Sequence, residues 1–129
     1  MTEADYGPSF QIIAAAGDSK GYSISAIKAA QNGEFEQAEA DMKEASSLLL
    51  EAHEFQTEMI TQEASGNIVP VNIILVHSQD HLSMAMTAQD LSEHLVEVYK
   101  EIHSLKEEIA VLKAVSYTHL RAHETGAYL

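Results

Sequence analysis

A seven-residue repeat of mostly apolar positions runs from Ile74 to Leu112. Its members, spaced alternately by three and four residues, are Ile74, His77, His81, Met84, Ala88, Leu91, Leu95, Val98, Ile102, Leu105, Ile109 and Leu112. We call this set the heptad seam. A helix with this spacing carries the set on one face and buries it against other helices. His77 and His81 interrupt the seam, where an imidazole is unfavourable without a partner or a function.

The composition predicts an all-α fold. Prolines occur only at positions 8 and 70, and β-branched residues cluster only over 68–76. The 129 residues suit one domain. We expect an antiparallel three-helix bundle subunit with helices over about 8–31, 34–64 and 72–113. The third helix, about 60 Å long at 1.5 Å per residue, favours a coiled-coil-like oligomer.

Turn residues and apolar spacing define the first two helices. Asn32 and Gly33 end the first helix, Ser65 to Asn67 end the second, and Pro70 prevents continuous helix into the third. The apolar face expected for the first helix consists of Phe10, Ile13, Ile24 and Ile27. The second helix keeps a heptad of Phe35, Ala38, Met42, Ala45, Leu49, Ala52, Gln56 and Met59.

The last residues depart from the heptad pattern. Continuing the heptad beyond Lys113 would place Ser116, His119 and His123 on the apolar seam. The stretch also resembles read-through translation of the kind sometimes appended to protein sequences. We therefore predict a domain over residues 1–115 and a disordered or non-native tail over 116–129, and we assign no function to His119 and His123.

The charge and the residue types exclude several classes of function. A formal charge of −13 argues against nucleic acid and anionic membranes as partners, and suits a basic protein or a metal cation. Acidic residues that merely cover solvated helix faces are an equal alternative. Without cysteine there are no disulfides or thiolate sites, which leaves histidine as the strong nucleophile. With no signal-peptide pattern and no membrane-spanning apolar run, we expect a cytoplasmic protein.

The segment around the two histidines carries the candidate chemistry. His77, Asp80 and His81 lie at positions i, i+3 and i+4, which share one face of a helix. This spacing alone leaves three alternatives: residues that fix helix register, a zinc or other transition-metal site, or a catalytic acid–base pair.

The surrounding sequence resembles a known family. The run IILVHSQDHLSMAMT over 73–87 resembles the active-site signature of the lactose/cellobiose-specific IIA components of the bacterial phosphoenolpyruvate-dependent sugar phosphotransferase system. The segments AAGDSK over 15–20, GEFEQAE over 33–39, EAH over 51–53 and QT over 56–57 resemble it in the same order. Ser78 and Ser83 depart from the family's frequent alanine and methionine.

This resemblance implies a cytoplasmic phosphotransferase that acts as a phosphocarrier. His77 would accept a phosphoryl group from phospho-HPr and pass it to a cysteine of the IIB component, for uptake of a β-disaccharide such as lactose, cellobiose or N,N′-diacetylchitobiose. His81 and Gln79 are candidate donors of hydrogen bonds to the phosphoryl oxygens. The resemblance also implies a homotrimer in which three copies of Asp80 bind Mg²⁺ or a similar cation.

Two alternatives to the phosphocarrier remain. In the first, His77, Asp80 and His81 hold a cation in a non-catalytic, metal-binding trimeric helical bundle. In the second, the chain is a coiled-coil interaction module without chemistry, and the polar residues only set register.

Overall fold

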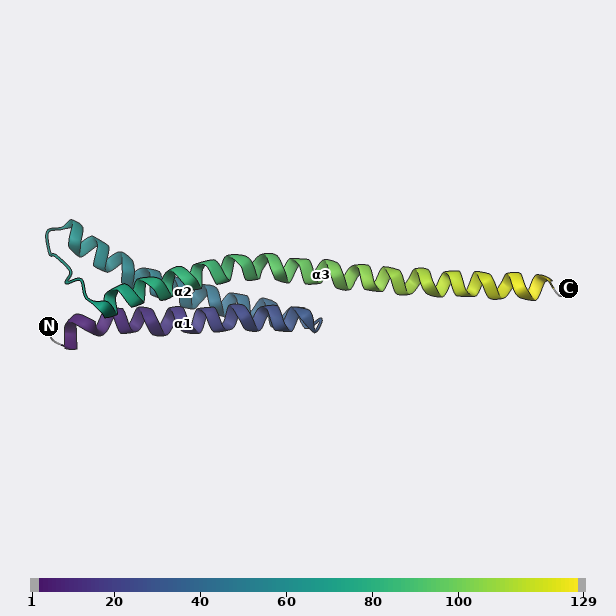
Figure 1. Cartoon of the computed structure of the whole chain (residues 1–129), viewed down its shortest axis with the longest axis horizontal. Helices are drawn as coiled ribbons and strands as arrows, with labels where there is room; N and C mark the ends of the chain where they lie inside the picture. The colour runs from purple at the N-terminus through teal and green to yellow at the C-terminus, as the bar shows by residue number, and fades with distance from the viewer. Residues whose placement is uncertain (1–2, 128–129) are drawn as a thin grey trace.

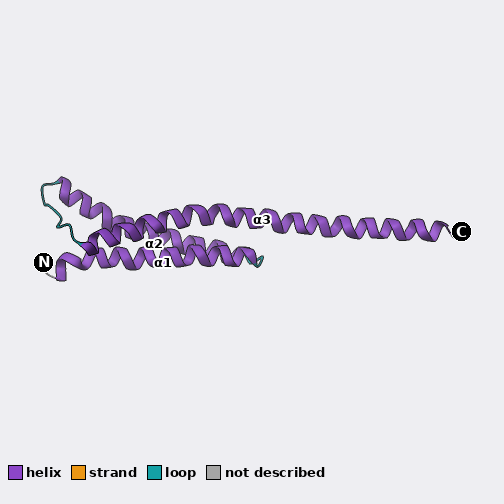
Figure 2. Cartoon of the chain, in the orientation of Figure 1, coloured by secondary structure: helices purple, strands orange, loops and turns teal. Residues whose placement is uncertain are grey.

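The computed structural model describes residues 3–127, and this part of the chain forms three helices without a strand. Helix α1 spans Glu3–Gln31, α2 spans Phe35–Ala64 and α3 spans Ile73–Ala127. Figure 1 shows α2 running back along α1, and α3 running in the direction of α1 far beyond the other two. Only two short loops connect the helices (Figure 2). The prediction of an all-α three-helix subunit is confirmed.

Glycine in the left-handed conformation ends both α1 and α2. Gly33 has a φ of 76°, and its N–H donates to Ala30 O while the N–H of Glu34 donates to Ala29 O. Gly66, with a φ of 93°, makes the equivalent pair of bonds after α2. These are Schellman motifs, in which a positive φ lets the last carbonyls of a helix find donors.

The packing face of α2 agrees with the predicted heptad, whereas that of α1 does not. All eight predicted α2 positions are buried or half-buried. In α1, however, Phe10 is 54% exposed and Ile24 is 39% exposed. The residues that α1 buries include Ser9, Ile12, Ala16, Ser19, Ser23, Ala26 and Ala30, at alternating steps of three and four, with Ala15 and Ala29 beside them. The predicted apolar face of α1 was therefore wrong at Phe10 and Ile24, while Ile13 and Ile27 are half-buried, because small side chains line the contact.

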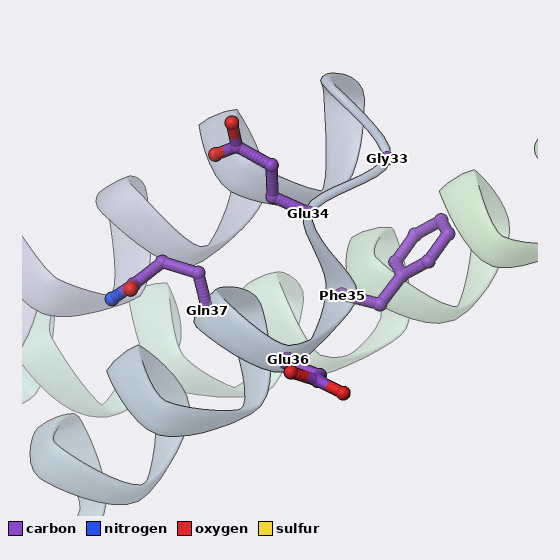
Figure 3. Close-up of a pocket in the computed structure, with 5 residues that line it drawn as sticks. All are labelled: Gly33, Glu34, Phe35, Glu36 and Gln37. Atoms are coloured by element: carbon purple, nitrogen blue, oxygen red, sulfur yellow. The ribbon is translucent and has the colours of Figure 1, made fainter.

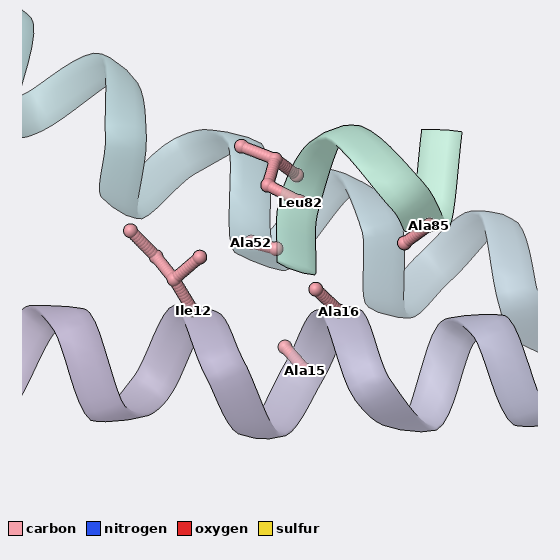
Figure 4. Packing of buried hydrophobic residues seen from close by; sticks show 6 residues of the cluster. All are labelled: Ile12, Ala15, Ala16, Ala52, Leu82 and Ala85. Carbon is pink, nitrogen blue, oxygen red and sulfur yellow. The ribbon is translucent and has the colours of Figure 1, made fainter. Parts of the chain in front are cut away.

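Small residues fill the centre of the bundle. One cluster combines Ile12, Ala15 and Ala16 of α1 with Ala52 of α2 and with Leu82 and Ala85 of α3 (Figure 4). A second cluster is formed by Ala26, Ala29, Ala30, Ala38 and Val96. Helix α1 packs extensively against both other helices, and α2 and α3 contact each other less. Small side chains let α1 approach both neighbours closely.

Helix α3 buries a different stripe from the one with the largest apolar residues. The positions facing α1 and α2 are Leu75, Ser78, Leu82, Ala85, Gln89, Ser92, Val96, Tyr99 and His103, which we call the interior stripe. It has the same seven-residue spacing as the heptad seam, displaced by one residue. Most of the seam is exposed in the single chain, with Leu91 at 57% and Leu105 at 55%. The seam is therefore not what holds the subunit together.

Polar contacts tie the far end of the hairpin to α3. Gln31 Nε2 donates to Tyr99 Oη over 2.8 Å, and His103 Nε2 lies 3.3 Å from the Gln31 carbonyl oxygen. Hydrogen bonds from Lys100 to Glu97 and then Glu39 raise the pKa of the Lys100 ammonium. These contacts lie in the middle of α3, and the side chains that follow over 104–124 are exposed.

The C-terminal stretch is helical, which differs from the prediction. Helix α3 continues to Ala127, where the failing heptad predicted no helix beyond Lys113. Residues 114–125 contain no proline or glycine, so no helix-breaking residue ends α3 there. Every side chain over 104–124 is exposed. That 116–129 is foreign to the domain stays a prediction, and Tyr128 and Leu129 lie outside the described residues. At the other end, α1 begins before the predicted Pro8.

Two glycine substitutions should change stability in opposite directions. An alanine Cβ at Gly21 in α1 would meet no heavy atom within 4 Å, whereas one at Gly33 would lie 3.2 Å from His103 Cε1 in a left-handed turn. We expect Gly21→Ala to raise the free energy of unfolding by about 1 kcal/mol and Gly33→Ala to lower it by about 1–2 kcal/mol. Urea unfolding at one protein concentration measures both free energies. Equal effects of the two substitutions would contradict the conclusion that, of these two glycines, only Gly33 needs a left-handed backbone.

Candidate functional site

The two histidines lie near the start of α3, on a helical turn that Asn72 anchors. Asn72 Oδ1 accepts a hydrogen bond from the N–H of Leu75 over 2.8 Å, and the Asn72 carbonyl accepts one from Val76 over 3.1 Å. An asparagine in this position satisfies amide groups that would otherwise lack partners at a helix start. The last residue of the loop thus holds the first turn of α3, and His77 follows directly after that turn.

His77 and His81 contact each other directly. Their Nε2 atoms are 3.1 Å apart, and the rings meet edge to face at 84° with centroids 4.5 Å apart. One Nε2 therefore donates a proton to the other, which must be bare. His77 is exposed and His81 half-buried. The structure confirms that the predicted pair shares one helix face, and places the His77 ring at the surface.

Gln79 lies on the far side of α3 from this pair. Its Oε1 accepts a hydrogen bond from Gln56 Nε2 of α2 over 2.5 Å, and its Nε2 donates to Ser78 Oγ over 3.2 Å. Ser78 is fully buried and donates onward to the carbonyl of Leu75 over 2.6 Å. The structure brings Gln79 together with α2 rather than with His77.

Asp80 is exposed and follows His77 by three residues, at the edge of the heptad seam. Among the residues that the structure describes, no group of three or more histidine, cysteine, aspartate or glutamate side chains could hold a metal ion within one chain. One carboxylate supplies too few oxygens for a hard divalent cation, which takes six or more ligands.

A hollow of the surface lies elsewhere. It is formed at the turn between α1 and α2 by Gly33, Glu34, Phe35, Glu36 and Gln37 (Figure 3). The four side chains point in different directions and come from one stretch of chain. A binding site needs polar groups that converge on one point. This turn therefore lacks the arrangement of a ligand pocket, and the histidine pair is the stronger candidate.

Gln56 is a residue at this site that the sequence reasoning did not select. It occupies a position of the α2 heptad that is otherwise apolar, between Ala52 and Met59. A polar residue at such a position needs a partner. That interruption was the available signal, but the identity of the partner, Gln79, depends on how α2 and α3 pack.

Comparison with known proteins agrees with the geometry. Residues 8–100 match the family described as "PTS system, Lactose/Cellobiose specific IIA subunit". The chain is 43% identical over 91 residues to the lactose-specific EIIA component of Lactococcus lactis subsp. lactis, covering 70% of this chain and 87% of that protein. No helix within residues 3–127 is long and apolar enough to cross a membrane.

Two solved structures share the fold. The crystal structure of the cellobiose-specific enzyme IIA from Bacillus anthracis has a TM-score of 0.78 at 32% identity, over 81% of this chain and 95% of that one. The IIA(Chitobiose)–HPr complex of Escherichia coli gives a TM-score of 0.68 at 30% identity, over 79% of this chain and 99% of that one. With the sequence match, this shows that the chain belongs to the lactose/cellobiose-specific IIA family of the sugar phosphotransferase system.

Proposed function

We propose that His77 carries the phosphoryl group in this IIA subunit, receiving it from phospho-HPr and passing it to the cysteine of a IIB component in the cytoplasm. The observation that carries this proposal is the exposed His77 ring, whose Nε2 faces His81 Nε2 at 3.1 Å. Related IIA proteins act in lactose and cellobiose systems, and one has been solved in complex with HPr. The substrate of the whole system is then a β-disaccharide.

The transfer needs His77 Nε2 without its proton. When His81 Nε2 is the donor of the observed hydrogen bond, His77 Nε2 is bare and its one lone pair accepts that bond. Once the His81 N–H turns to an oxygen of the incoming phosphoryl group, this lone pair forms the new N–P bond as the N–P bond to the donor protein breaks. In the second step the IIB thiolate attacks phosphorus, and His77 leaves as a bare nitrogen again. No proton has to cross the site in either step.

His81 is placed to stabilise the phosphorylated form. Once phosphorus occupies His77 Nε2, the His81 N–H loses its acceptor there and turns to a phosphoryl oxygen one bond away. Gln79 would first have to release Gln56, because its amide is bonded on the opposite side of α3. Of the two predicted donors, we therefore assign the direct role to His81.

The acidic chain suits HPr as a partner only if HPr brings positive charge. A net charge of −13 repels a free phosphate but attracts a basic protein that carries one. Phosphoryl transfer between two proteins, rather than from a small molecule, is consistent with this charge. The bound donor would supply the positive charge that the transition state requires.

We expect His77 to be labelled by the donor cascade. Incubation with phosphoenolpyruvate, enzyme I and HPr should add one acid-labile phosphoryl group, about 80 Da, to the intact mass. His77→Gln should abolish the label, and the matched control His94→Gln, at an exposed histidine elsewhere on α3, should keep it. A wild-type chain that stays unlabelled beside an active HPr would contradict the proposal, and would favour the non-catalytic metal-binding bundle.

We further propose that the heptad seam of α3 is covered by two other copies of the chain in a homotrimer. Large apolar residues such as Leu91, Leu95 and Val98 are 40–57% exposed along it. Contiguous apolar surface of this kind is rare on a monomer, and heptad spacing is what helices use to pack around a common axis. The family resemblance supplies the number three. His77 would then lie beside a boundary between subunits.

A substitution in the seam should break the trimer. We expect Leu91→Glu to give particles near the 14.1 kDa of one chain, because a buried carboxylate opposes packing of the seams. The control Leu120→Glu changes an equally exposed leucine, 58% against 57%, beyond the region that pairs. Light scattering measures both. Wild type and Leu91→Glu of the same size at micromolar concentration would contradict the trimer.

We propose Mg²⁺ or a similar divalent cation as the occupant of a site formed by three copies of Asp80. The carboxylate is exposed at the edge of the seam, so assembly through the seam brings its copies toward one axis. Carboxylate oxygens are the ligands that such hard cations prefer. The cation, when bound, would offset the repulsion among the three carboxylates. The phosphoryl-transfer step itself uses His77 and His81.

Metal removal should test this site separately from the chemistry. We expect EDTA to lower the melting temperature of the wild-type assembly, and Mg²⁺ to restore it. Asp80→Asn should lose this response, whereas Asp90→Asn, at an exposed aspartate ten residues farther along α3, should keep it. If Asp80→Asn responds to Mg²⁺ as wild type does, the cation binds elsewhere.

A further inference from the structure

The end of the bundle that holds His77 has the least support from α2. Figure 1 shows α2 and the start of α3 separating toward this end, where residues 65–72 span the gap. Farther along, α2 and α3 are joined by bonds from Gln89 to Ser46 and from Lys100 to Glu39. Near His77, the direct side-chain hydrogen bond between the two helices among the described residues is the one from Gln56 to Gln79.

This bond is the first of three in a row. Gln56 Nε2 donates to Gln79 Oε1 over 2.5 Å, Gln79 Nε2 to Ser78 Oγ over 3.2 Å, and Ser78 Oγ to the Leu75 carbonyl over 2.6 Å. The row begins in the C-terminal third of α2 and ends on the backbone of the first turn of α3. It therefore connects α2 to the turn from which His77 projects.

The row is partly shielded from water. Ser78 is fully buried, and Gln56 and Gln79 are half-buried along a groove whose other walls include Met59 and Leu75. A hydrogen bond is stronger in such surroundings, and an amide left there without a partner is costly. The groups therefore hold their positions rather than exchange freely with solvent.

The row of hydrogen bonds contacts α3 on the side opposite the His77 imidazole. At 3.6 residues per turn, Gln79 lies about 200° around the helix from His77, and Ser78 about 100°. Fixing these two positions sets the rotation of the turn, and so the direction in which His77 and His81 point. In-line attack on phosphorus is sensitive to displacements of about 1 Å. Through this row, α2 can therefore influence the position of the backbone that carries His77.

We propose that Gln56 is a positioning residue for phosphoryl transfer, which acts through Gln79 and Ser78 to hold the turn that bears His77. This inference rests on the phosphocarrier role proposed above. Gln56 does not touch the phosphoryl group in this scheme. Its loss should lower the rate of transfer within the bound complex without weakening the binding of HPr.

The test compares three variants in single-turnover labelling by phospho-HPr. Gln56→Met keeps the length of the side chain but cannot donate, and should lower the maximal rate about tenfold with half-saturation for HPr within about twofold of wild type. Gln56→Glu should restore part of the rate, because its carboxylate accepts from Gln79 Nε2 after the Gln79 amide turns over, and the Ser78 hydroxyl can then donate to Gln79 Oε1. Gln37→Met, which removes a bond to Asp41 within α2, should match wild type.

Nitrogen-15 NMR of the imidazoles adds a readout independent of transfer. In wild type, one Nε2 of the His77–His81 pair should be protonated and the other bare, and Gln56→Met should move both signals while Gln37→Met moves neither. Circular dichroism checks that each variant is folded at the assay temperature, and Gln56→Ala replaces the methionine variant if that one is not.

Three results would overturn the inference. These are an unchanged maximal rate in folded Gln56→Met or Gln56→Ala, a change confined to half-saturation, or a Gln56→Glu variant as slow as the methionine one. A wild-type chain that is never labelled would instead contradict the phosphocarrier role, so the two failures are distinguishable.

Discussion

Helix α3 has two neighbouring stripes with the same seven-residue spacing, and the fold can bury only one of them within a subunit. The stripe that packs on α1 and α2 includes Ser78, Ala85 and Ser92 among its larger apolar residues, whereas the adjacent seam is made mostly of leucine, isoleucine and valine over residues 91–112. Hydrophobic stabilisation grows with the apolar area removed from water. A subunit whose interior is rich in alanine and serine therefore leaves much apolar area exposed on its surface. Other copies of the chain can bury this area.

This division also determines where the chemistry lies. His77 projects on the seam side of α3, so its imidazole is exposed in one subunit and can meet a partner protein. Gln79 projects on the opposite side and is bonded to α2. One helical turn thus exposes a nucleophile on one side and is hydrogen-bonded to α2 on the other. The direct contact between His77 and His81 adds a nitrogen that accepts a proton beside one that donates it.

The success of the sequence predictions depended on the size of the packing residues. The α2 face was predicted correctly because large and small apolar residues there follow one heptad. The α1 face was not, because Phe10 and Ile24 are its largest apolar residues, while the contact is made by alanine and serine, which hydrophobicity alone does not single out. The C-terminal part of α3 was predicted to lose its helix, yet absence of an apolar stripe does not end a helix that contains no breaking residue.

The sequence by itself determined the helices, their glycine stops and the spacing that puts His77, Asp80 and His81 on one face, because all of these follow from local geometry. It also carried the family signature. Only the tertiary structure decided which stripe of α3 faces inward, that Gln56 is the partner of Gln79, and that the amide of Gln79 points away from His77. These features depend on how closely α2 and α3 pack against α1. That distance is determined by the sizes of side chains on all three helices together.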